Sequence, residues 1–197
     1  MKPIDQVLET AEKIRSMEIR GAGRIATAAA ASLRDYALAL AKEVQELDEY
    51  NKHMRQAADI LLKTRPTAVS LSNAIRMAMK YQADDVPSAQ KAIVANADRF
   101  IENSARALER IGSIGSRRIR DGDTVLTHCN SMAAISVIST AHKSGKRVRV
   151  IATESRPRYQ GLTTIGMLDR LGIETDLIVD SAARSIMNEV DMVVVGA

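Results

Sequence analysis

The hydrophobic pattern changes once along the chain, near residue 120, and this change constrains the fold more than any other feature. Before it, apolar residues recur every three or four positions, which is typical of amphipathic helices. After Asp121, short β-branched runs alternate with segments of helical composition. We therefore expect an α/β protein, with an all-helical N-terminal domain over residues 1–119 and a Rossmann-like parallel sheet with flanking helices over residues 120–197.

The helices of the first part are bounded by glycine and proline. Pro3 suits the first turn of a helix, the Gly21–Gly23 segment separates the first helix from the second, and Pro66 ends the third. We expect the later helices at about 24–44, 47–63, 72–81 and 88–111. In the second part we expect strands at 124–127, 148–152, 177–179 and 192–195, with helices of about ten residues between them.

Composition excludes several classes of protein. No apolar stretch is long enough to cross a membrane and no secretory leader opens the chain. A single cysteine excludes an internal disulfide and fits a reducing, cytoplasmic setting, and the three histidines are too scattered for a zinc site. The net charge of +4 favours anionic ligands, but with 3% aromatic residues it does not indicate a nucleic-acid binder.

Cys129 is the main candidate for chemistry, because it follows the first expected strand and precedes a helix. Ligands bind at the C-terminal strand ends of such sheets, and a helix N-terminus favours a thiolate or a phosphate. The alternative is a small cysteine that only packs, and burial would oppose the thiolate. We expect the neighbouring His128 side chain on the opposite face of the strand, in a structural role.

Several segments are candidates for binding a phosphorylated ligand. Arg20, Gly21, Ala22 and Gly23 open a helix, where an arginine and free N–H groups suit phosphate. The alternative is a plain helix–helix turn. Arg65, in a loop stiffened by proline, would clamp a second phosphate or be merely solvated.

The strand ends supply further candidates. The N–H groups of Ser131, Met132 and Ala133 suit phosphate or sugar oxygens, unless Ser131 is an ordinary N-cap. Arg156 and Gln160 follow the second strand, where pairing of Glu154 with an arginine is an equally good interpretation. We expect Asp180 to cap a helix beginning at Ser181.

Five motifs together resemble one known family: 128–131 (HCNS), 154–157 (ESRP) with 160–161 (QG), 179–183 (VDSAA) and 194–197 (VVGA). The family unites ribose-1,5-bisphosphate isomerases, methylthioribose-1-phosphate isomerases and regulatory subunits of the exchange factor for initiation factor 2. Segments 17–23 and 64–70 are most similar to the archaeal ribose-1,5-bisphosphate isomerase branch. Each motif is weak alone, but their order and spacing are specific.

The resemblance implies a site between the two domains, with Cys129 as an acid–base residue and an Asp directly after the Gly-Ala pair as its partner. Because Ala197 is the last residue, that Asp is missing, and we expect a C-terminally truncated, inactive chain. The implied activity is conversion of ribose 1,5-bisphosphate to ribulose 1,5-bisphosphate in nucleotide salvage. No metal or redox cofactor is implied; AMP is a candidate activator, and the complete protein is expected to be a homo-oligomer.

Two alternatives remain within the family. A methylthioribose-1-phosphate isomerase handles one phosphate, whereas this sequence offers two candidate phosphate sites. A non-catalytic regulatory subunit of the initiation factor 2B type usually lacks the cysteine that stands here at Cys129.

Overall fold

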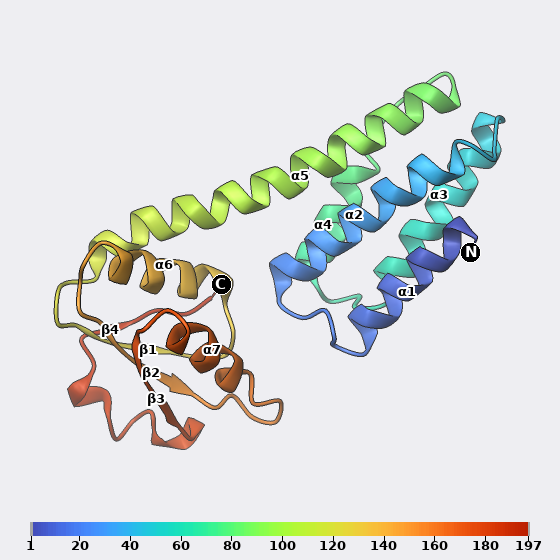
Figure 1. Ribbon diagram of the computed structural model, residues 1–197. Coiled ribbons are helices and arrows are strands. Elements are labelled where there is room, and N and C mark those ends of the chain that lie inside the picture. The colour runs from blue at the N-terminus through green and yellow to red at the C-terminus, as the bar shows by residue number, and fades with distance from the viewer. Residues whose placement is uncertain (1, 197) are drawn as a thin grey trace. The chain divides into compact units, whose positions relative to one another are not determined.

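The computed structural model describes residues 2–196 and divides into two compact units, 1–105 and 106–197 (Figure 1). The division falls inside α5 (Val86–Gly115), earlier than the change of sequence pattern near 119. The reason is that the last turns of α5 pack within the second unit. The Ser136 hydroxyl donates to the Leu108 carbonyl at 2.9 Å, and Gly112 lies directly against Ser136.

The first unit is a bundle of α1 (Pro3–Arg15), α2 (Ala22–Leu40), α3 (Leu47–Leu62), α4 (Val69–Ala78) and the first part of α5 (Figure 1). Pro3 opens α1, where the Lys2 N–H donates to the Asp5 carboxylate at 2.8 Å. The bounds of these helices agree with the expected ones to within a few residues.

Alanines allow close packing around α2. Ala29, Ala30 and Ala37 are fully buried there, and small residues let neighbouring helices approach closely. The core is completed by larger side chains, among them Leu33, Tyr50, Met54, Leu61, Leu71 and Ile93. The Tyr50 hydroxyl donates to the Ala37 carbonyl at 3.2 Å, so its one polar group is satisfied.

The second unit contains a parallel sheet of β1 (Thr124–Thr127), β2 (Arg149–Thr153), β3 (Glu174–Ile178) and β4 (Met192–Val193). The strand order is β3-β2-β1-β4 among the described residues. The helices α6 (Met132–Lys143) and α7 (Gln160–Asp169) connect the first three strands. Their core joins Val125 and Val150 of the sheet to Ile138 of α6 and Leu168 of α7.

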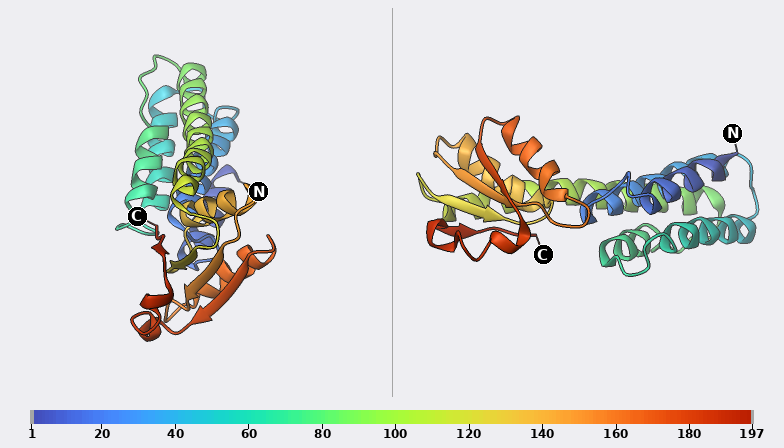
Figure 2. Two further views of the ribbon diagram at one scale, coloured as in Figure 1. Left: turned by 90° about the vertical axis from the view of Figure 1, so that its left-hand side faces the viewer. Right: turned by 90° about the horizontal axis from the view of Figure 1, so that it is seen from below.

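Chain direction explains the two faces of this sheet. β1, β2 and β3 lie next to one another in chain order, and the chain then returns to the other side of β1 to form β4. Right-handed crossovers therefore place α6 and α7 on one face and the segment 179–191 on the other, as the right-hand view of Figure 2 shows. The second strand has the expected length but lies one residue later, at 149–153. The third, 174–178, is longer than the expected 177–179, and the fourth, 192–193, is shorter than the expected 192–195.

The expected helix beginning at Ser181 is absent. Segment 179–191 forms only two short 3₁₀ turns, Asp180–Ala182 and Met187–Glu189. The Asp180 carboxylate bonds to the turn after β2 and therefore does not cap a helix. Within residues 2–196, no helix combines the length and apolar character needed to span a membrane.

Candidate functional site

Cys129 lies in the turn between β1 and α6 and has a left-handed backbone conformation, with φ of 63°. This conformation is uncommon for residues other than glycine, and it often occurs at functional sites. The turn ends at Ser131, the N-cap of α6, so the cysteine precedes this helix by three residues. The thiol side chain is half-buried rather than enclosed in the core.

Three side chains from the next strand and helix bind Cys129. Its N–H donates to Ser155 Oγ at 2.8 Å, and its carbonyl accepts from Thr164 Oγ1 at 2.7 Å. The thiol donates to Gln160 Oε1 over 3.4 Å. Gln160 is the first residue of α7, so its side chain links the sulfur to a second helix, a contact that the sequence pattern did not reveal. A half-turn of the Gln160 amide would present its NH₂ group to a thiolate.

A glycine brings α7 to this position. A Cβ built on Gly161 would lie 1.9 Å from the Thr153 carbonyl oxygen, so only glycine fits between α7 and the end of β2. The Gly161 N–H donates to the Glu154 carbonyl at 3.2 Å. Gln160 is thereby held against the turn that contains Cys129.

Asp180 anchors the turn after β2. Its two carboxylate oxygens accept the N–H groups of Ser155 and Arg156, each at 2.8 Å. The N–H groups of Arg156 and Ser155 lower the pKa of the Asp180 carboxyl below its ordinary value, because they stabilise the charged form. The expected capping role was therefore wrong, since this side chain ties the end of β3 to the turn after β2.

His128 contacts two hydroxyl groups of the turn after β2. Its Nδ1 lies 2.5 Å from Thr153 Oγ1 and 3.4 Å from Ser155 Oγ. Its ring therefore contacts the same Ser155 hydroxyl that accepts from the N–H of Cys129.

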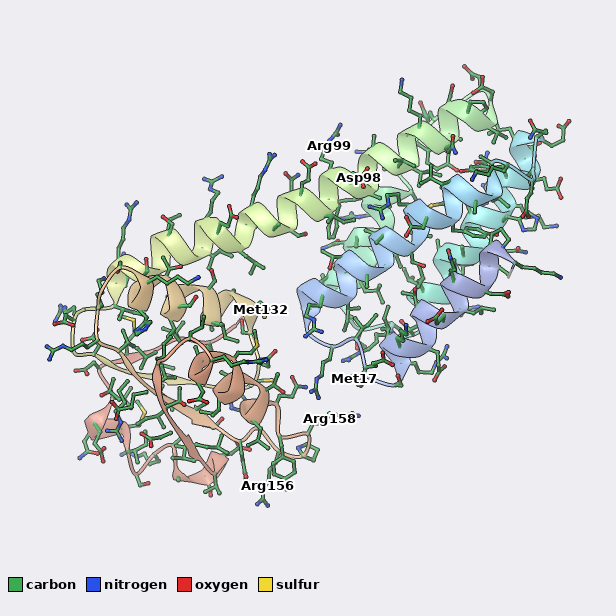
Figure 3. The ribbon with its side chains drawn as sticks, viewed as in Figure 1. Met17, Asp98, Arg99, Met132, Arg156 and Arg158 are labelled. Carbon is green, nitrogen blue, oxygen red and sulfur yellow. The ribbon has the colours of Figure 1, made fainter. Side chains whose placement is uncertain are left out.

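Arg156 pairs with Glu154, which was the alternative interpretation of this turn. Its Nε donates to Glu154 Oε1 at 2.5 Å, and its guanidinium carbon lies 5.9 Å from the centre of the Tyr159 ring. The side chain is largely exposed and points outward (Figure 3). The Glu154 carboxylate raises the pKa of this guanidinium. A phosphate would therefore compete with an internal carboxylate for Arg156.

The α6 N-terminus contains the remaining candidates of the second unit. Ser131 Oγ accepts the Ala134 N–H at 3.3 Å and is thus an N-cap, as the alternative interpretation had it. This leaves the N–H groups of Met132 and Ala133 in the first turn, where N–H groups have no partner within the helix. Asn130 donates to Thr164 Oγ1 at 3.0 Å and so helps to join this turn to α7.

The first unit brings its own candidates together. Gly21 has φ of 92° and is the N-cap of α2, which begins at Ala22 and includes Gly23; Arg20 directly precedes this cap. α2 has no side-chain cap among the described residues, so its first N–H groups face outward from the helix end.

Arg65 approaches the same loop from the connection between α3 and α4. Its guanidinium lies 2.8 Å from the sulfur of Met17, which Figure 3 labels in the loop between α1 and α2. The Ser70 hydroxyl, from the start of α4, donates to the Ala22 carbonyl at 3.1 Å. The structure thus joins the two segments that the sequence singled out for phosphate.

The assembled strand-end cluster has the components for proton transfer. It presents a half-exposed thiol beside an amide that accepts from S–H, with N–H groups of a helix nearby. Ser155 and Thr164 were missed by sequence reasoning. One signal for Ser155 was available, since it follows β2 at the same interval as Cys129 follows β1. Between residues 2 and 196, His, Cys, Asp and Glu form no cluster of three suited to a metal ion.

Comparison with known proteins shows the family of the chain. The model of the initiation factor 2 subunit family matches residues 18–197. A ribose 1,5-bisphosphate isomerase of Archaeoglobus fulgidus is 54% identical, over 98% of this chain and 60% of that protein. The chain thus spans about three fifths of the length of this relative.

Two solved structures from Pyrococcus horikoshii are also similar. One is a 5-methylthioribose 1-phosphate isomerase, with 30% identity, a TM-score of 0.83 and coverage of 97% of this chain and 57% of that one. The other is a translation initiation factor eIF-2B, with 29% identity, a TM-score of 0.84 and coverage of 97% and 66%. The chain therefore belongs to the initiation factor 2 subunit family.

Proposed function

We propose that the whole protein is a sugar-phosphate isomerase that converts ribose 1,5-bisphosphate to ribulose 1,5-bisphosphate. The observation that carries this proposal is the 54% identity to a protein of that name, together with the Cys129 turn. The reaction moves a hydrogen between C2 and C1 of the opened sugar. Moving it as a proton needs a group that both accepts and returns it.

Cys129 is the proposed group. Its sulfur lies beside Gln160, which accepts from the thiol in one amide orientation and donates to the thiolate in the other. Cys129 also stands three residues before α6, at the end of a helix where negative charge is favoured. Ring opening needs an acid as well, and we propose that an Asp following Ala197 in the whole protein supplies it.

Phosphate binding is proposed for two sets of residues. In the first unit, the α2 N-terminus with Arg20, and Arg65 beside the same loop, offer charge-assisted donors. In the second unit, the N–H groups of Met132 and Ala133 at the start of α6 are the candidates. Arg20 with Gly21–Gly23, and Arg65, are two candidate phosphate sites within the first unit, which favours a bisphosphate over a monophosphate.

The setting that we propose is nucleotide salvage in the cytoplasm, with AMP as an activator and with the whole protein as a homo-oligomer. Neither nucleic acid nor membrane is needed as a partner for this reaction.

Isomerisation assays of the whole protein with both sugars test the proposal. We expect turnover of ribose 1,5-bisphosphate and much weaker turnover of methylthioribose 1-phosphate. A variant with Arg65→Met should raise KM for the bisphosphate, whereas Arg76→Met, which changes an exposed arginine of α4 bonded to Asn73, serves as the matched control. Preference for the thioether substrate would overturn the assignment.

A second candidate is a methylthioribose-1-phosphate isomerase, favoured by the TM-score of 0.83 to a structure of that name. The same assay decides between the two substrates. A third is a non-catalytic regulatory subunit, favoured by the TM-score of 0.84 to an eIF-2B structure. A stable complex with initiation factor 2, without turnover of either sugar, would support that one.

A further inference from the structure

Three residues at equivalent places in the sheet form one chain of hydrogen bonds. Cys129, Ser155 and Asp180 each stand two residues beyond the last residue of their strand, after β1, β2 and β3. The Cys129 N–H donates to Ser155 Oγ, and the Ser155 N–H donates to Asp180 Oδ1, both at 2.8 Å. The bonds therefore run across the sheet from the outer strand β3 to the turn that holds the thiol.

The first two residues of this chain have unusual backbones. Cys129 and Ser155 are both left-handed, with φ of 63° and 59°. Side chains other than glycine rarely adopt this conformation, and it persists only where the surroundings hold it. For Cys129 the bond to Ser155 Oγ is such a restraint, since it fixes the N–H side of the turn.

Ser155 is well placed to provide the restraint. It is 7% exposed, and its hydroxyl accepts from Cys129 while it contacts the Thr153 carbonyl at 3.3 Å. Asp180 fixes the backbone of Ser155 from the opposite side and uses its second oxygen for the Arg156 N–H. A charged acceptor makes these bonds stronger than bonds to a neutral group.

We propose that Ser155 and Asp180 are positioning residues that hold Cys129 in its left-handed turn and thereby keep its sulfur against the Gln160 amide. The proposal rests on the proposed role of Cys129 in proton transfer. Without the restraint, the Cys129 backbone would relax to an ordinary conformation. The sulfur would then leave Gln160, whose amide can donate to a thiolate in its other orientation.

Alkylation of the sole cysteine by iodoacetamide tests this without any substrate, and it applies to the present chain. The readout is the ratio of the alkylation rate at about pH 7 to the plateau rate at high pH. Greater exposure of the sulfur raises the plateau rate and, because burial opposes the thiolate, does not lower the ratio. Loss of the Gln160 contact and of the helix end lowers the ratio. From the usual strength of a helix terminus, we expect Ser155→Ala to lower the ratio by about two- to fivefold.

Asp180→Asn is an independent test, because loss of its charge and loss of its positioning role change the alkylation ratio in opposite directions. The charged or titratable groups at these strand ends include His128 after β1, Asp180 after β3, and Glu154, Arg156 and Arg158 after β2. Removing the Asp180 charge would by itself favour a thiolate and raise the ratio. If positioning dominates, the ratio falls instead. Ser155→Ala leaves all of these charges in place.

Asp191→Asn is the matched control. Its carboxylate also accepts a backbone N–H at 2.8 Å, that of Thr124, but at the opposite end of β1. We expect it to leave the ratio unchanged. Circular dichroism confirms folding of each variant, and if Ser155→Ala is unstable, Asp180→Asn decides by the sign of its effect.

An unchanged ratio in Ser155→Ala, or a raised one in Asp180→Asn, would overturn the positioning role. The result is independent of the proposed function, because alkylation reports the environment of the sulfur, whereas failure of the isomerase assignment appears only as absent turnover in the whole protein.

Discussion

Gly161→Ala tests whether α7 is held against the end of β2 as closely as the site requires. The added Cβ would lie 1.9 Å from the Thr153 oxygen, 2.9 Å from the Thr153 carbonyl carbon and 3.0 Å from the Glu154 Cα. All three are backbone atoms, so no side chain can rotate away. Because real Cβ contacts essentially never fall below 3.0 Å, the helix start must retreat from the strand by about 1 Å.

The change in the free energy of unfolding of Gly161→Ala is the balance of two opposing effects. Overpacking of a rigid site costs about 1–3 kcal/mol, and a clash with backbone belongs at the upper end of that range. Alanine gains about 0.5–1 kcal/mol over glycine within a helix. We therefore expect Gly161→Ala to lower the free energy of unfolding by about 2 kcal/mol.

Gly166→Ala is the control within the same helix. A Cβ at Gly166 has no atom of another segment within 4 Å. This variant should gain about 0.5–1 kcal/mol. Urea denaturation of the two variants and the parent measures the difference. Equal stability of Gly161→Ala and Gly166→Ala would refute the close approach of α7 to β2, and with it the placement of Gln160 beside the thiol.

Two further predictions concern parts of the fold away from the thiol. Tyr50→Phe removes the donor to the Ala37 carbonyl in the bundle core and should lower the free energy of unfolding by about 1 kcal/mol; an unchanged urea midpoint would show that this bond contributes nothing. Hydrogen bonding to Arg147 lowers the pKa of Asp121 below its ordinary 3.8, so this bond stabilises the fold above that pH. The stability difference between the parent and Asp121→Asn should thus shrink as the pH falls below 3.8, and a difference that grows on acidification would contradict this interpretation.

The strand-end site was predictable in part because apolar runs determine where strands end. The β-branched run 124–127 predicted β1 with its observed bounds, and the position of Cys129 followed from that. The general rule for parallel sheets then directed attention to residues 154–157 and Asp180. What the pattern did not contain is backbone conformation, since nothing in the sequence marks Cys129 or Ser155 as left-handed.

The error at Asp180 has a physical cause. Segment 179–191 has a composition compatible with a helix, but the Asp180 carboxylate bonds to N–H groups of the turn after β2 instead. A local sequence pattern does not reveal a hydrogen bond between the ends of two strands.

The most direct test of the account is Cys129→Ser in the whole protein, assayed with ribose 1,5-bisphosphate. A hydroxyl is far less acidic than a thiol, so it cannot accept and return the C2 proton near neutral pH. We expect substrate binding to be retained, as measured by calorimetry, and turnover to be lost along with any incorporation of solvent deuterium into the product. Turnover equal to that of the parent would show that the thiol does not carry the proton.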